Sequence, residues 1–192
     1  MCSAIIYVSK HIMSNPEIGF REVKTSGYVQ QQFEMMGLAS RSGLARMGVK
    51  TRLKGRNSEL TFGILGELDA LLVPVSPVSD PVTHAAHACG HNAQIASMLG
   101  AGLGLQAVMQ HLDGDVVLFT VPAEECITVE ERLELRARGE IEFIVGNPEL
   151  IRLGEFDDID MITITNTTTG RDDSQASVGD THNGALIKRV GH

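Results

Sequence analysis

The sequence predicts an α/β domain, and three observations carry this prediction. Short apolar runs alternate with longer stretches in which apolar residues recur at helical spacing. Hydrophobic residues make up 43% of the 192 residues and charged residues 21%, a balance that supports a buried core and argues against disorder. The order strand, strand, loop, helix, strand is typical of an α/β sheet that contains parallel strands.

The N-terminal part predicts helices. Residues 2–13 suit a short helix, and Asn15-Pro16 has the pattern of an N-cap followed by proline at the first helical position. From 21 to 36 the apolar side chains fall on one helical face, and Gly37 stands where a C-terminal cap is expected.

Strands and one long loop are expected next. Val49–Lys54 alternates apolar and polar residues and Leu60–Leu65 is an apolar run, so we expect two adjacent strands joined at 55–58. Residues 71–83 hold three prolines and form a loop.

The rest of the chain completes the α/β order. Residues 92–112 predict a helix whose glycines at 100, 102 and 104 would allow close packing on a sheet. The other expected elements are strands at 115–121, 160–165 and 185–190 and two charged, solvated helices at 130–138 and 148–153.

Charge and composition exclude several classes of protein. Sixteen Lys and Arg against 24 Asp and Glu give a net charge of −8, which argues against binding of nucleic acid through phosphates. The longest apolar stretches fall short of the ~20 residues that cross a bilayer. Three cysteines do not make a disulfide framework, and the N-terminus lacks the pattern of a signal peptide, so we expect a cytoplasmic protein.

The densest cluster of chemically active side chains lies between the loop and the following helix. His84, His87, Cys89 and His91 fall within eight residues, and Gly90 allows a tight turn between the last two. Imidazole and thiolate are usual zinc ligands. The competing interpretation is a chance cluster, because structural zinc sites normally show two separated ligand pairs.

Carboxylates follow two of the expected strands. Glu124 and Glu125 come after the strand at 115–121, and Glu67 and Asp69 come after the strand that ends near 65. Adjacent carboxylates point in different directions, so one can bind a cation while the other acts as a general base. A solvated acidic edge is the alternative, although ligands in open α/β sheets gather beyond the carboxyl ends of strands.

These segments resemble the aminoacylase/carboxypeptidase-type amidohydrolases, a branch of the co-catalytic zinc metallopeptidases. The resemblance runs through the chain in the family's order, in NPEIGFRE (15–22), GELDALLVP (66–74), HAAHACGHNAQIASMLGAG (84–102), VVLFTVPAEE (116–125), NPELIRLGEFDDIDM (147–161) and ASVGDTHNGALIKR (176–189). It implies a three-layer α/β/α zinc-peptidase-like catalytic domain that is incomplete. Residues 1–192 would be its N-terminal part, ending where a lid domain begins.

The resemblance also implies roles for particular residues. Cys89, His91 and Glu125 would bind metal, Glu124 would be the catalytic general base, and Asp69 would orient the site. The cofactor would be a divalent metal, two zinc ions by preference, with manganese or cobalt as alternatives. The substrate would be an acylated amino acid or a dipeptide-like amide.

Three departures from the family support a competing hypothesis. Asn92 replaces an aspartate beside the metal ligands, Asn166 stands where the family has a histidine ligand, and the chain is about half the family's length. We therefore expect the amidohydrolase to be inactive or incomplete as this chain alone. The alternatives are a non-catalytic relative that acts as a binding or partner subunit, and one part of a split enzyme. An incomplete sheet also predicts a homo-oligomer or a complementing chain, and His182 is expected to be a loop residue.

Overall fold

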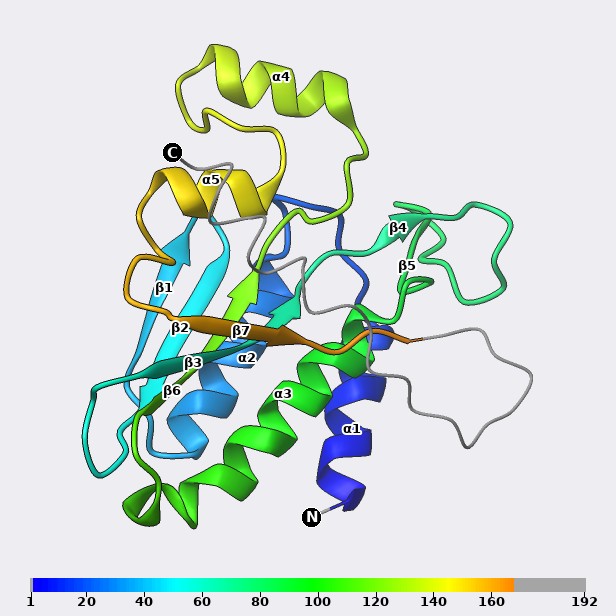
Figure 1. Cartoon of the computed structure of the whole chain (residues 1–192). Coiled ribbons are helices and arrows are strands. Elements are labelled where there is room, and N and C mark those ends of the chain that lie inside the picture. The colour runs from blue at the N-terminus through cyan, green and yellow to red at the C-terminus, as the bar shows by residue number, and fades with distance from the viewer. Residues whose placement is uncertain (1, 168–192) are drawn as a thin grey trace.

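The computed structural model describes residues 2–167 as a mixed sheet flanked by helices (Figure 1). In chain order the elements are α1 (Cys2–Met13), α2 (Val23–Met35), β1 (Ser40–Leu44), β2 (Gly48–Leu53), β3 (Thr61–Glu67), β4 (Leu71–Leu72), β5 (Ala85–Ala86), α3 (His91–Gln106), the 3-10 turn η1 (Met109–His111), β6 (Asp115–Val121), α4 (Val129–Ala137), α5 (Gly146–Arg152) and β7 (Met161–Ile164).

The five-stranded sheet has the order β1-β2-β6-β3-β7. β3 runs parallel to both β6 and β7, whereas β1 and β2 form the antiparallel side. Glu67, the last residue of β3, pairs in register with Val121, the last residue of β6. The carboxyl ends of these two central strands therefore lie side by side at the same end of the sheet. The mixed sheet with flanking helices confirms the α/β prediction.

We predicted that the strands at 49–54 and 60–65 are adjacent. This prediction is wrong, because β6 lies between the corresponding strands β2 and β3. The connection between them passes over the start of β6 and is held there by Asp115. Its carboxylate accepts the Gly55 N–H at 3.0 Å, and its own N–H donates to the Leu60 carbonyl at 2.7 Å. Every residue of β6 is buried, so this apolar run takes the central position.

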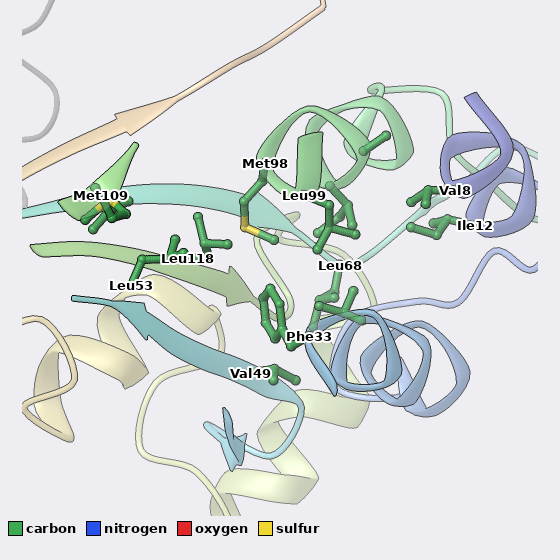
Figure 2. Packing of buried hydrophobic residues seen from close by; sticks show 14 residues of the cluster. Val8, Ile12, Phe33, Val49, Leu53, Leu68, Met98, Leu99, Met109 and Leu118 are labelled. Atoms are coloured by element: carbon green, nitrogen blue, oxygen red, sulfur yellow. The ribbon is translucent and has the colours of Figure 1, made fainter. Parts of the chain in front are cut away.

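Two layers of side chains cover the sheet. Under one face, α1, α2 and α3 enclose the core cluster in Figure 2, which includes Phe33, Met98 and Leu118. On the other face, Phe119 packs with Leu150 of α5 and with Phe156 and Ile159 from the segment before β7. The alternation along β6 sends Leu118 to one layer and Phe119 to the other.

Local details also differ from the sequence predictions. No helix begins at Asn15-Pro16: the Asn15 side chain instead donates to the His11 carbonyl at 2.8 Å, and α2 begins at Val23. The polar strand β1 was not predicted, because it lacks an apolar run. The helices α4 and α5 are not simply solvated, since Arg132 and Glu149 are each only 1% exposed.

The prediction that glycines let α3 pack closely on the sheet holds for one of the three, Gly102. A Cβ on Gly102 would lie 2.5 Å from the Leu118 side chain, whereas one on Gly104 would meet nothing within 4 Å. Gly100 instead faces Ile5 of α1. Within residues 2–167, every helix is too short or too polar to cross a membrane.

Candidate metal centre

The candidate site lies beyond the carboxyl ends of β3 and β6. β3 ends at Glu67 and Asp69 follows two residues later, while the chain leaving β6 carries Glu124 and Glu125. The α3 helix begins at His91 directly after the left-handed Gly90, whose φ is 92°. Three segments distant in sequence thus place their polar side chains at one edge of the sheet.

His91 is the centre of this arrangement and is 1% exposed. Its Nδ1 lies 2.8 Å from the backbone oxygen of Asp69, so this nitrogen carries the proton and donates it. The other nitrogen, Nε2, lies 2.9 Å from a carboxylate oxygen of Glu67 and 3.9 Å from one oxygen each of Glu124 and Glu125. The imidazole therefore points Nε2 at a group of carboxylates.

The turn that carries the two glutamates has an unusual backbone. Ala123 has a φ of 50°, in the left-handed region that L residues rarely adopt. Its N–H donates to the buried Glu22 carboxylate at 2.7 Å, and its carbonyl accepts the Gly146 N–H at 2.9 Å. The Glu125 N–H donates to Asp69 at 2.9 Å. Surrounding residues thus hold this turn in place.

The donor set fits a divalent cation. Cys89, His91 and Glu125 place one ligand atom each within 4.8 Å of one another, and so do Glu67, His91 and Glu124. His91 Nε2 is buried, and its nearest described partner is a Glu67 carboxylate oxygen at 2.9 Å. A cation between these ligands would bind the nitrogen and neutralise the carboxylates around it.

In the absence of a cation, the neighbouring carboxylates of the site shift the pKa values of its titratable groups. Burial disfavours the charged imidazole, but Asp69 and Glu67 outweigh it and raise the pKa of His91 to about 11. Burial, followed by the charges of Glu67 and Glu125, raises the pKa of Glu124 to about 7. Burial also raises the pKa of the Cys89 thiol. A bound cation would favour the ionised forms of these carboxylates and of the thiol.

The predicted histidine and cysteine cluster divides into separate environments. Cys89 and His91 join the site, whereas His84 is exposed and His87 is buried with both ring nitrogens unpartnered among the described residues. Burial lowers the pKa of His87 to about 4. Cys126 is exposed, and neither His87 nor Cys126 belongs to a ligand group.

The two asparagines that depart from the family form hydrogen bonds to residues that are not candidate ligands. The Asn92 side chain donates to the Ser9 hydroxyl of α1 at 2.9 Å, so it is turned away from the carboxylates that we expected it to adjoin. Asn166 is exposed, and its side-chain oxygen accepts the Thr167 N–H at 2.8 Å. Thr167 in turn donates to the Cys89 carbonyl at 2.9 Å, so the chain after β7 does reach the metal-ligand turn. His182 and the strand expected at 185–190 lie outside the described residues.

Glu67 and Gln94 are two residues of the site to which the sequence patterns gave no role. Glu67 is 8% exposed, and its carboxylate accepts a hydrogen bond from Gln94 at 3.0 Å. The Gln94 side-chain oxygen accepts the Glu67 N–H at 3.1 Å. The position of Glu67 at the end of a parallel strand was the available signal, whereas nothing in sequence singled out a glutamine of α3.

Comparison with known proteins finds similarity to several hydrolases. No protein-family model matches the chain. The chain is 33% identical over 121 residues to the IAA-amino acid hydrolase ILR1-like 6 of Arabidopsis thaliana, which covers 62% of this chain and 26% of the relative. It is 30% identical over 127 residues to thermostable carboxypeptidase 2 of Saccharolobus solfataricus, covering 63% of this chain and 32% of the relative.

The fold agrees with these matches. The YXEP protein of Bacillus subtilis, described as a dinuclear metal-binding peptidase, superposes with a TM-score of 0.67 at 23% identity, covering 83% of this chain and 41% of that one. The chain thus spans about a third or less of these curated relatives and under half of that solved structure. By sequence the chain is similar to the N-terminal part of amidohydrolases and carboxypeptidases, and it shares the fold of the corresponding part of a dinuclear metal-binding peptidase.

Proposed function

We propose that this chain carries the metal-binding and proton-transfer part of an amidohydrolase that cleaves an N-acyl-amino acid or a dipeptide-like amide. One observation carries the proposal: Cys89, His91 and Glu125 converge as ligands while Glu124 stands beside them on the same turn. A bound divalent metal would polarise the amide carbonyl and the attacking water.

The chain's own residues would handle the proton. Glu124 would accept a proton from the attacking water and return it to the leaving nitrogen, a role that suits a half-buried carboxyl group whose pKa burial raises above its ordinary value. Its side chain is 35% exposed, so water and substrate can reach it. Asp69 holds the imidazole of His91 in one tautomer and fixes the Glu125 backbone. These contacts keep the general base in a constant position relative to the ligands.

We further propose zinc as the preferred metal at the Cys89, His91 and Glu125 group. Thiolate, imidazole and carboxylate together suit zinc and cobalt better than magnesium or calcium. Elemental analysis of the purified chain after dialysis would test this, with near-stoichiometric zinc expected.

A non-catalytic role as a partner subunit is the second candidate. Asn166 supports it, because this residue stands where the family has a histidine ligand and its side-chain oxygen accepts the N–H of the neighbouring Thr167. Within residues 2–167, β7 also forms an edge of the sheet and exposes Met161 and Ile164, a surface suited to another chain. Sedimentation or light scattering would reveal a dimer or a complex.

Hydrolysis of a panel of N-acyl-amino acids by the metal-loaded chain separates these candidates. The enzyme proposal expects turnover that falls at least 100-fold in Glu124→Gln while bound metal is retained. Glu130→Gln, a change of the same kind at an exposed position of α4, serves as the matched control. Metal-free protein without turnover in excess zinc would overturn the enzyme proposal for this chain.

A further inference from the structure

A pocket of about 450 Å³ lies between α4, the loop at 19–21 and the turn that joins β1 to β2. Arg132 and Leu135 of α4 line it, together with Phe20 of the loop and Arg46 of the turn. The residues that line this pocket include no candidate metal ligand. It is therefore a separate site from the metal centre.

Arg132 is the most deeply buried charged residue of this pocket and is only 1% exposed. Its Nη1 donates to the Ile144 carbonyl at 2.8 Å, whereas Nε and Nη2 are buried and have no hydrogen-bond partner within residues 2–167. Burial lowers the pKa of this guanidinium, although the charges of Asp69 and Glu22 act in the opposite direction. A buried cation with unfilled donors is unfavourable, and a bound anion would satisfy both the charge and the donors.

The two unfilled donors of Arg132 lie on the same edge of its guanidinium group. Along this edge, Nε–H and one N–H of Nη2 run parallel and match the two oxygens of a single carboxylate. The guanidinium carbon lies 5.5 Å from the centre of the Phe20 ring, and a Cβ added to Gly19 would collide with Nη2. Because Gly19 and Phe20 both line the pocket, the charged end of Arg132 adjoins the same space.

The charges around the pocket favour a ligand with one negative charge. Four arginines and two glutamates line it, and Glu140 beside it pairs with two of these arginines. Arg21 pairs with Glu131 at 2.7 Å. The balance is one positive charge on a chain whose net charge is −8, and Arg132 is the lining arginine whose free edge has no partner among the described residues.

The pocket also offers apolar surface to a ligand. Phe20 and Leu135 line it and pack together in the small core cluster that includes Ala123. Its volume matches a small organic molecule, since pockets for such ligands measure roughly 300–1,000 Å³. A carboxylate on an apolar body would pair with Arg132 and cover these two side chains, whereas inorganic phosphate would offer charge alone.

We propose that this pocket binds a small organic monocarboxylate. The carboxylate would occupy the Nε and Nη2 edge of Arg132, and the apolar body would lie against Phe20 and Leu135. The site goes beyond the proposed function and does not depend on it, because no candidate metal ligand takes part.

Isothermal titration calorimetry on the full chain tests the proposal, with benzoate as the probe. Metal is removed first, so that a carboxylate cannot bind to an ion. Benzoate should bind saturably at one site per chain. Benzamide, a neutral molecule of the same shape, should bind about tenfold more weakly because it cannot form a charged pair with Arg132. Inorganic phosphate should also bind about tenfold more weakly because it leaves the apolar walls uncovered.

Arg132→Lys should weaken benzoate binding by about tenfold, because lysine keeps the charge but lacks the two parallel donors. Arg136→Lys is the matched control, since it makes the same change at an exposed position of α4 outside the pocket lining. This control should bind benzoate like the parent chain. Circular dichroism establishes that each variant is folded.

Glu131→Gln provides a second route if Arg132→Lys fails to fold. It removes a negative charge from the pocket lining at an exposed residue, so benzoate should bind about two- to fivefold more tightly. Glu130→Gln, the same change at the neighbouring exposed residue outside the lining, should leave the affinity unchanged.

Three results would overturn the proposal. Equal affinities for benzoate and benzamide would show that the charge of Arg132 plays no part, and phosphate binding as tight as benzoate binding would show a general anion site. Benzoate affinities like that of the parent in folded Arg132→Lys and in Glu131→Gln would show that the carboxylate does not bind in this pocket. By contrast, a chain that binds no metal or hydrolyses no amide would overturn the proposed function and leave this inference intact.

Discussion

The carboxylate of Asp69 accepts a hydrogen bond from the Glu125 N–H over 2.9 Å, which joins the segment after β3 to the turn after β6. The other oxygen of Asp69 lies 3.3 Å from Nδ1 of His91. One fully buried side chain therefore contacts both a histidine and a glutamate of the candidate metal group.

Asp69→Asn should weaken zinc binding by about 10–100-fold, because the imidazole loses the carboxylate beside Nδ1 while the shape of the side chain is retained. Competition with a coloured chelator measures the affinity. The exposed Asp157→Asn is the matched control and should bind zinc like the parent chain. A loss of less than threefold at Asp69 would show that its role is confined to packing.

Asn92→Asp should leave metal affinity within threefold of the parent, because the Asn92 side chain faces Ser9 on α1. The substitution removes the donor of this hydrogen bond from a buried position, so the free energy of unfolding should fall by roughly 1–2 kcal/mol. Urea unfolding and metal titration measure the two effects.

Ser9→Ala supplies the control for Asn92, since it removes the partner of the same hydrogen bond. The double variant should lose less stability than the sum of the two single losses. A tenfold gain in zinc affinity for Asn92→Asp would instead place residue 92 at the metal.

Glu22→Gln should reduce the loss of stability with rising pH. Burial, reinforced by the charge of Asp69, raises the pKa of Glu22 from 4.5 to about 8. Between these values the unfolded chain releases the proton while the folded chain keeps it, so stability falls as pH rises, by up to about 1.4 kcal/mol per pH unit. Glutamine can still accept the Ala123 N–H but cannot ionise.

Urea unfolding from pH 5 to 8, with a chelator present, measures this difference. His91 and Glu124 titrate in both proteins, so the difference between the two curves isolates Glu22. Glu34→Gln, at an exposed position of α2, should reproduce the parent curve. Parallel curves for Glu22→Gln and the parent would contradict the raised pKa.

Two glycine substitutions should change stability in opposite directions. A Cβ on Gly146 would lie 1.7 Å from the Pro122 carbonyl, so Gly146→Ala must displace backbone beside the acidic turn and should cost about 1–3 kcal/mol. Gly27 lies in α2 with nothing within 4 Å of its added Cβ, and Gly27→Ala should stabilise by about 0.5–1 kcal/mol. Thermal unfolding compares them, and a stable Gly146→Ala would show that this contact relaxes easily.

Much of the fold could be predicted from the sequence because local patterns report local structure. The apolar run at 115–121 predicted β6 with its observed limits, and the helical spacing in 21–36 predicted α2 to within two residues. The pairing of β2 with β6 could not be predicted in this way. Pairing is a long-range choice, and it depends on which strand is apolar on both faces and so takes the centre of the sheet.

The sequence by itself identified the kind of chemistry, since the Cys-Gly-His triplet and the Glu124-Glu125 pair carry the donors that a divalent metal needs. Only the tertiary structure decided how these donors share the space. In the folded chain the Asn92 side chain bonds to α1, and His87 is buried outside the site. Glu67 lies 2.9 Å from His91 and accepts a hydrogen bond from Gln94. Residue type sets what a side chain can bind, whereas the backbone of β3, β6 and α3 sets where its atoms lie.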